Sequence, residues 1–171
     1  MTADRDPCRR VPAPLTRAAF ARFGDVIEAG EQARHFTINQ GYTERYHDLA
    51  RVDVDAGDGR ALVNIFRSTP LPKPLRLTVM ERHPLSSQAF FPLSQRPYLV
   101  AVAPAGEFSA AAIEVFLAAP SQGVNYHRGT WHHFCLALEQ TSDFLVLDRG
   151  GEGDNCDQVL LEASQIITVD V

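Results

Sequence analysis

The stretch Leu75-Arg76-Leu77-Thr78-Val79-Met80-Glu81-Arg82-His83 decides how this sequence is interpreted. Aliphatic residues at positions 75, 77 and 79 alternate with other residues, which is typical of a β-strand with one buried face. The same alternation places Glu81 and His83 on that face, because alternate residues of a strand share one side of the sheet. A buried carboxylate or imidazole needs partners, so we interpret this strand end as a functional site. The alternative is a strand end where both side chains meet solvent.

A second polar stretch, His127-Arg128-Gly129-Thr130-Trp131-His132-His133, follows farther along the chain. Consecutive strand residues face opposite sides of a sheet, so only one of His132 and His133 can face the interior. The other is expected to be an outward or interface histidine. Gln88 begins the predicted return strand after His83, and from there it can reach the same pocket.

Short apolar runs separated by turn residues make up most of the chain, which favours a mainly β fold, either a sandwich or a closed barrel. One short N-terminal helix is predicted from Thr16, a suitable N-cap, to Phe23, with Gly24 as its C-terminal stop. A weaker helical turn is predicted over residues 108–112, and a loop between Gly123 and Gly129. Strands are predicted over residues 25–27, 35–39, 61–66, 75–83, 88–92, 98–103, 113–118, 134–138, 144–148 and 158–162.

The length of 171 residues, with 45% hydrophobic content, is enough for one well-buried core. We therefore predict a single domain over residues 1–171, in which residues 1–13 form a loosely ordered N-terminal segment. The net charge of −5 argues against a broad electropositive surface for nucleic acid or anionic lipid. The expected partner is a small molecule.

The cysteines Cys8, Cys135 and Cys156 are far apart and form no C-x-x-C pair. This usage is typical of a reducing compartment without a disulfide framework. The polar N-terminus does not resemble a signal peptide, and no long uncharged apolar run occurs in the chain. We expect a cytoplasmic protein that does not associate with a membrane.

The spacing of Glu81-x-His83, then Gln88, and later Gly129-x-x-His132 resembles the two sequence motifs of cupins. Cupins usually have two histidines at the first two positions and a glutamate where Gln88 stands. The second motif usually has a proline where His127 stands.

Longer blocks resemble the ureidoglycolate lyase family, formerly called ureidoglycolate hydrolases. These blocks are residues 44–49, 81–85, 88–90, 122–128, 131–133, 143–145, 148–151 and 154–157. The resemblance implies a cupin-type barrel (a double-stranded β-helix) and a cytoplasmic, homodimeric enzyme. It also implies cleavage of (S)-ureidoglycolate to glyoxylate and urea by acid–base elimination, in allantoin and purine catabolism.

Ureidoglycolate carries a hydroxyl, a carboxylate and a urea nitrogen on one carbon. Elimination of urea from this molecule needs a base that accepts the hydroxyl proton and an acid that protonates the departing nitrogen. It also needs a cation that binds the carboxylate. A histidine suits either proton-transfer role, and Glu81 could take the other or orient the histidine. The candidate catalytic residues are Glu81, His83, Gln88 and His132. The candidate substrate-binding residues are Arg67, Arg82, Asn125, His127 and Arg128, with Arg149 as a further arginine.

The residues Glu81, His83, Gln88 and His132 are also a candidate metal site. One carboxylate and two imidazoles can bind a divalent transition metal, although the amide of glutamine is a weak ligand. The resemblance associates the family with an ion such as Ni²⁺. The sequence leaves both a metal-assisted and a metal-free reaction open, and the departures from the cupin motifs favour proton transfer.

Two other functions are compatible with these residues: a metal-dependent cupin enzyme that acts on another small hydroxy acid, and a non-catalytic cupin that binds a small acid. Residues 44–48 are expected in a pocket wall or a dimer contact. Asp148 and Arg149 are expected to form a structural ion pair at the end of a strand.

Overall fold

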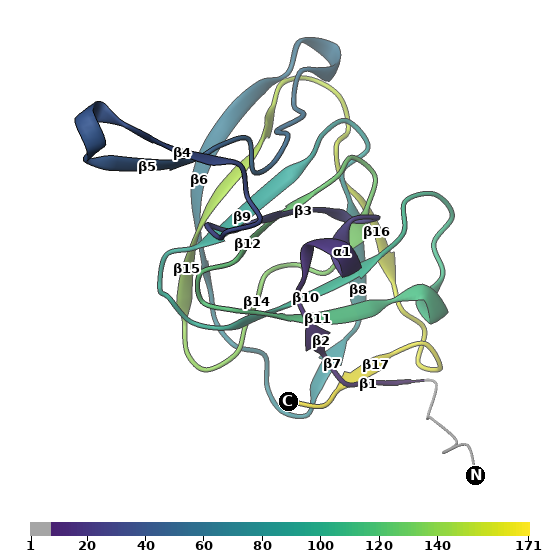
Figure 1. Cartoon of the computed structure of the whole chain (residues 1–171). Helices are drawn as coiled ribbons and strands as arrows, with labels where there is room; N and C mark the ends of the chain where they lie inside the picture. The colour runs from purple at the N-terminus through teal and green to yellow at the C-terminus, as the bar shows by residue number, and fades with distance from the viewer. Residues whose placement is uncertain (1–7) are drawn as a thin grey trace.

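The computed structural model describes residues 8–171, which form a mainly β fold (Figure 1). One large sheet contains β2 (Ala13–Pro14), β8 (Val79–Arg82), β10 (Tyr98–Ala103), β11 (Glu114–Ala118), β13 (Trp131–His132), β14 (Leu136–Ala137) and β16 (Asp157–Leu160). A second contains β3 (Gly24–Ile27), β6 (Arg60–Ser68), β9 (Gln88–Pro92), β12 (Gly123–Tyr126) and β15 (Ser142–Gly150). Their strand orders are β16-β8-β13-β10-β11-β2, with β14 beside β10, and β3-β12-β9-β15-β6.

Two smaller sheets complete the described part of the chain. The first consists of β1 (Arg9–Arg10), β17 (Ile167–Val169) and β7 (Leu75–Leu77). The second is the hairpin of β4 (His35–Ile38) and β5 (Thr43–Tyr46), which projects from the body as an arm (Figure 1). Helical segments are short: α1 (Arg17–Phe20), η1 (Asn39–Gly41), η2 (Ala56–Asp58) and η3 (Ala110–Ala112).

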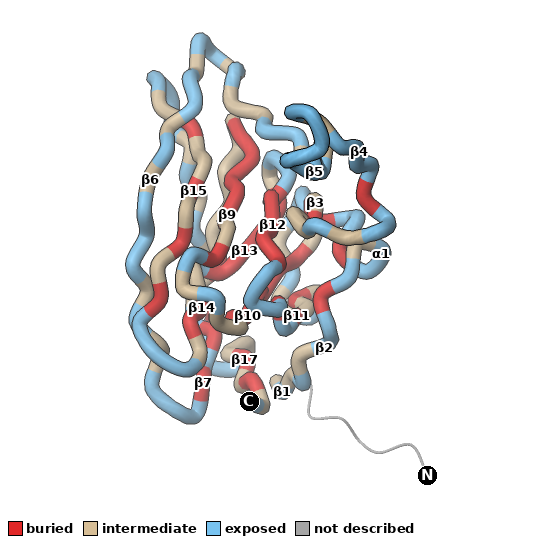
Figure 2. The backbone as a smooth tube through the Cα atoms, turned by 60° about the vertical axis from the view of Figure 1, so that its left-hand side comes forward, coloured by how far each residue is buried: buried red, intermediate tan, exposed pale blue. Residues whose placement is uncertain are grey.

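Two hydrophobic cores lie on opposite faces of the β10 sheet. The barrel core contains residues such as Phe90, Val102 and Val146, from both large sheets. The second core contains residues such as Leu77 and Trp131 and includes strands of the three-stranded sheet. Because β10 has a core on each side, all six of its residues are buried, whereas the edge strand β6 is largely exposed (Figure 2).

The predicted strand over residues 75–83 is interrupted at Thr78, whose carbonyl accepts a hydrogen bond from the backbone N–H of Leu161. Residues 75–77 pair with β17, while β8 pairs with β13 and β16. Met80 therefore joins Leu77 in the second core. The expectation that Glu81 shares its face with Leu75 and Leu77 is wrong, since the interruption shifts the alternation by one residue. Glu81 instead lies on the same side as His132, with which it is paired.

The predicted N-terminal helix is shorter than expected. Thr16 is its N-cap, as predicted, and its hydroxyl accepts a hydrogen bond from the N–H of Ala19. The prediction that Gly24 ends the helix is wrong, because this glycine is the first residue of β3 and pairs with Tyr126. A side chain at position 24 would place its Cβ 1.9 Å from the carbonyl oxygen of Asn125, so the close pairing of β3 with β12 requires glycine.

Most predicted strands are present, and the ranges 88–92 and 98–103 match β9 and β10. The predicted loop after Gly123 is wrong in its first half, since residues 123–126 form β12, which pairs with β3 on one side and β9 on the other.

A loosely ordered segment was expected over residues 1–13, of which residues 1–7 lie outside the described residues. From Arg9 onward it is paired, because β1 runs parallel to β17 and the side chain of Arg10 donates to the carbonyl of Ile113.

Candidate active site

Glu81, His83 and His132 meet at one end of the barrel core. Strand pairing places Glu81 of β8 directly opposite His132 of β13, and His83 follows β8 immediately. One potential ligand atom from each of the three residues lies within 4.8 Å of the other two. Gln88, the first residue of β9, has its Oε1 3.1 Å from Nε2 of His83. The structure thus brings together all four residues that the sequence predicted as catalytic.

His132 is the buried member of this cluster, with 1% of its surface exposed. Its ring stacks on Tyr126 with the centroids 4.3 Å apart and the planes 5° apart. Burial, followed by the nearby His83, lowers the pKa of His132 to about 3, so the ring is neutral at physiological pH. Nδ1 lies 3.2 Å from the carbonyl oxygen of His133, which can only accept, and Nε2 has no hydrogen-bond partner. The neutral ring therefore carries its proton on Nδ1 and has a free lone pair on Nε2.

His83 lies between two oxygen atoms. Its Nδ1 is 2.6 Å from the carbonyl oxygen of Asn155, and its Nε2 faces the amide oxygen of Gln88. Both oxygens are acceptors, so this arrangement is satisfied when both ring nitrogens carry protons. A proton on either ring nitrogen can therefore be donated to a neighbouring oxygen or to a ligand.

Asn155 was not predicted as a site residue, yet it fixes the backbone after β8. Its side-chain oxygen accepts a hydrogen bond from the N–H of Leu85 at 2.8 Å, and its amide nitrogen donates to Oγ of Ser86 at 2.9 Å. Together with the bond from His83, these contacts hold residues 83–86 in place. Asparagine is common in loops for many reasons, so local sequence carries little signal for this role.

A cavity of about 250 Å³ opens beside the cluster. This volume suits a small molecule with few heavy atoms. Its lining residues are His83, Ser86, Gln88, Asp148, Arg149, Asn155 and Cys156.

Asp148 is a further residue that sequence reasoning missed. It follows Phe144 and Val146 on the barrel face of β15, an alternation that could have identified it. Burial raises the pKa of its carboxyl group, while hydrogen bonds from Gln88 and Asn64 act in the opposite direction. Its expected ion pair with Arg149 is wrong, because adjacent strand residues point to opposite faces. Arg149 instead donates to the backbone carbonyls of Ala56, Gly57 and Glu152.

The three arginines predicted to bind substrate are not brought to the cluster. Each is in an ion pair with a carboxylate elsewhere, and Arg82 also covers the ring of Trp131, on the side of the second core. The pairs are Arg67 with Asp143, Arg82 with Asp157 and Arg128 with Asp53, at N–O distances of 2.7, 2.7 and 2.6 Å.

Asn125 and His127 also lie away from the cluster. Asn125 is fully buried, and its amide nitrogen donates to Asp25 and to the carbonyl of Arg51. The ring of His127 lies 3.2 Å from another oxygen of Asp25. Asn125 therefore holds the segment that precedes β6, and neither residue is among those that line the cavity.

His133 follows β13, and its backbone N–H donates to the carbonyl of Ala101. It is not outward, because only 2% of its surface is exposed. Its ring packs on Phe134, and burial lowers the pKa of His133 to about 4.

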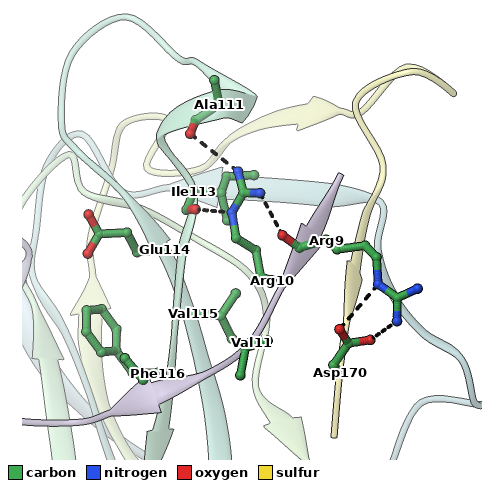
Figure 3. A pocket seen from close by; sticks show the side chains of 10 residues that line it. Arg9, Arg10, Val11, Ala111, Ile113, Glu114, Val115, Phe116 and Asp170 are labelled. Carbon is green, nitrogen blue, oxygen red and sulfur yellow. Dashed lines mark hydrogen bonds and ion pairs between the residues drawn. The ribbon is translucent and has the colours of Figure 1, made fainter. Parts of the chain in front are cut away.

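A larger hollow of about 840 Å³ lies between β1 and β11 (Figure 3). Its charged groups are already engaged, since Arg9 pairs with Asp170 and Arg10 donates to the carbonyls of Ile113 and Ala111. No histidine or cysteine is among its described lining residues. The chemistry therefore points to the Glu81 cluster.

Comparison with known proteins shows the family of this chain. The family model described as ureidoglycolate lyase matches residues 9–168, a range that contains the whole cluster. A protein named ureidoglycolate lyase from Burkholderia mallei (strain NCTC 10229) is 54% identical over 157 residues, which are 92% of each chain. One from Burkholderia cepacia is 57% identical over 151 residues, covering 88% of this chain and 85% of its own. One from Pseudomonas syringae pv. syringae (strain B728a) is 49% identical over 158 residues, again 92% of each chain. This chain belongs to the ureidoglycolate lyase family.

Proposed function

We propose that this protein is a ureidoglycolate lyase, which cleaves (S)-ureidoglycolate to glyoxylate and urea in allantoin and purine catabolism. The observation that carries the proposal is the cluster of Glu81, His83 and His132 beside a small cavity, in a chain that belongs to this family. The cluster supplies both a proton acceptor and a proton donor within reach of one small substrate.

In the proposed reaction, the carboxylate of Glu81 accepts the hydroxyl proton of the substrate. The oxygen then forms the carbonyl of glyoxylate as the bond from carbon to the urea nitrogen breaks. His83 donates a proton to that nitrogen, and urea leaves. Gln88 orients His83 through the 3.1 Å contact. No water is consumed, so the reaction is an elimination.

The same residues fit a divalent transition metal. Their donor atoms are one carboxylate oxygen and two imidazole nitrogens, and the buried Nε2 of His132 has no other partner. Glu81, His83 and His132 would hold the ion, with Gln88 as a weak fourth ligand. An ion such as Ni²⁺ would supply a Lewis acid for the hydroxyl and carboxylate oxygens of the substrate.

Measuring the reaction with and without metal separates these two modes. The metal content of purified protein is determined, and the rate is compared before and after dialysis against a chelator. Acid–base catalysis by the protein alone predicts an unchanged rate in the metal-free protein. A rate that is lost with the ion and restored by Ni²⁺ would show that the ion is required.

We also propose that the two large sheets form a single cupin-type barrel and that the protein is a cytoplasmic homodimer. Support for the dimer comes from β6, an edge strand on which Val63 is 69% exposed and Ile65 55% exposed. These residues lie beside Leu145 and Leu147 of β15. An apolar outer face of this kind is a common site of association. Among the described residues, no helix is long and apolar enough to cross a membrane.

The decisive experiment is a glyoxylate-release assay on purified protein with (S)-ureidoglycolate. We expect release well above the spontaneous background, with no release from the other enantiomer. Stoichiometric metal with no action on ureidoglycolate, but turnover of another small hydroxy acid, would favour the alternative cupin enzyme. Binding of glyoxylate without turnover of any such substrate would favour the non-catalytic alternative.

A further inference from the structure

Asp148 is the second carboxylate of the cavity and has no role in the reaction described above. It lies at the end of β15, on the face that also carries Val146 in the barrel core. It lines the same cavity as His83 and Gln88. It therefore reaches the ligand space from the opposite large sheet to the one that carries Glu81.

The neighbours of Asp148 differ from those of several other carboxylates in the described chain. Asp53, Asp143 and Asp157 each contact an arginine. Within residues 8–171, no arginine or lysine forms an ion pair with Asp148. Its hydrogen bonds come from two neutral amides: Nδ2 of Asn64 at 3.0 Å, and Gln88.

A carboxylate held in this way can still accept hydrogen bonds from a ligand. Its two oxygens offer roughly four acceptor positions, and the bonds from Asn64 and Gln88 use only part of them. Because these amides come from β6 and β9, on either side of β15, they fix the carboxylate in place, while His83 also acts on it electrostatically. The group it suits is a neutral donor with more than one N–H.

We propose that Asp148 is the residue that recognises the ureido group of the substrate. This inference rests on the proposed function. It names the residue by which the site would distinguish acids that carry a ureido group from other small acids. A ureido group presents N–H bonds from two nitrogens side by side, and a carboxylate accepts such a pair with both oxygens. The substrate then lies with its ureido group towards β15 and its hydroxyl towards Glu81 and His132.

The first test compares two inhibitors in an Asp148→Asn variant. Ureidoacetate carries the ureido group and a carboxylate but no hydroxyl, whereas glyoxylate has no ureido group. An amide at position 148 presents an N–H to the ureido N–H, so we expect ureidoacetate to bind about tenfold more weakly, as for the loss of a charge-assisted hydrogen bond. Glyoxylate should bind as it does to wild type. Asp143→Asn, on the same strand but paired with Arg67, is the matched control and should leave both inhibitors unaffected.

The second test uses wild-type protein and is independent of whether the variant folds. Ureidoacetate with two methyl groups on its terminal nitrogen lacks the outer N–H donors and should bind much more weakly than ureidoacetate. Equal binding of the methylated and unmethylated compounds, or an equal loss of both inhibitors in Asp148→Asn, would overturn the assignment of Asp148. Failure of wild-type protein to cleave ureidoglycolate would instead overturn the proposed function, while these binding results would still decide whether Asp148 reads a ureido group.

Discussion

At the scale of single residues, Glu81 and His132 face each other across paired strands but differ in burial. Glu81 is half-buried and near the thiol of Cys156 and the amide of Gln158, so it can exchange protons with a ligand. His132 is enclosed and remains neutral. This difference in burial is why we propose Glu81, and not His132, as the residue that transfers a proton.

Replacing Glu81 with glutamine removes the proposed base and keeps the size of the side chain. We expect kcat to fall by about 10²–10⁴-fold, the usual contribution of a positioned base, with a smaller change in KM. The assay is glyoxylate release at saturating substrate. Glu114→Gln, which alters a surface ion pair with Arg22, should retain wild-type kcat. A wild-type rate in Glu81→Gln would remove Glu81 from the mechanism.

The buried His133 should make the free energy of unfolding depend on pH. Its pKa in the folded protein is about 4, below its ordinary value of 6.5, so the unfolded chain takes up a proton first as the pH falls. Stability is therefore lost as the pH drops through about 6.5 towards 4. In His133→Leu, the free energy of unfolding should fall less steeply between pH 6 and pH 5, by about 1 kcal/mol per pH unit.

Urea unfolding at several pH values measures this slope. Between pH 7.5 and pH 8.5 the curves for wild type and His133→Leu should be parallel, because the histidine is neutral in both states there. Parallel curves at pH 5–6 as well would show that His133 is not protonated on unfolding in that range.

The proximity of Glu81, His83, Gln88 and His132 could be predicted because these residues stand at the short spacings typical of the two cupin motifs. The positions of Arg67, Arg82 and Arg128 could not. Arg67 meets Asp143 only because β6 pairs with β15 in one particular register, and local spacing does not contain that register. Asp148 was missed because its neighbour Arg149 suggested an ion pair, although the alternation along β15 already separated the two side chains.

At the scale of elements, β12 is a strand that the sequence pattern did not predict. This strand is central and fully buried, yet it begins with Gly123 and contains Asn125. The amide nitrogen of Asn125 donates to Asp25 and to the carbonyl of Arg51, contacts that exist only after distant segments meet. By contrast, β9 and β10 have continuous apolar runs between turn residues, so their bounds could be predicted.

The contact between β3 and β12 predicts a strong effect at Gly24. In Gly24→Ala, the new Cβ would meet backbone atoms of Asn125, which cannot move without separating the strands. We expect a loss of unfolding free energy of about 2 kcal/mol or more, as for overpacked interiors. Chemical denaturation provides the measurement. Gly30→Ala is the control, since nothing lies within 4 Å of its added Cβ, and it should be nearly neutral. Equal stability of both variants would mean that β3 and β12 pair less closely.

At the scale of the whole molecule, the proposed dimer makes the outer face of β6 the surface to test. The double variant Val63→Asp with Ile65→Asp places charges on that face without disturbing the barrel core. We expect wild type to have the mass of a dimer in solution and the variant that of a monomer, because an unpaired charge in an apolar interface is costly. Light scattering after size exclusion gives both masses.

Leu160→Asp provides the comparison, since Leu160 is 78% exposed on β16, in the other large sheet. This variant should remain a dimer. A wild-type monomer, or a dimer that survives the double substitution, would contradict the proposed interface.

The interruption at Thr78 has a consequence for how the activity of this protein could be altered. Met80 and Glu81 are adjacent on β8, but the first packs in the second core and the second lies on the same side as His132. A change in the size of Met80 or of its neighbours would shift β8 and move the Glu81 carboxylate relative to His132, although no atom of the cavity had been replaced. Laboratory evolution for new substrates should therefore select substitutions in the second core. Although remote from the substrate, they would change the distance between Glu81 and His132.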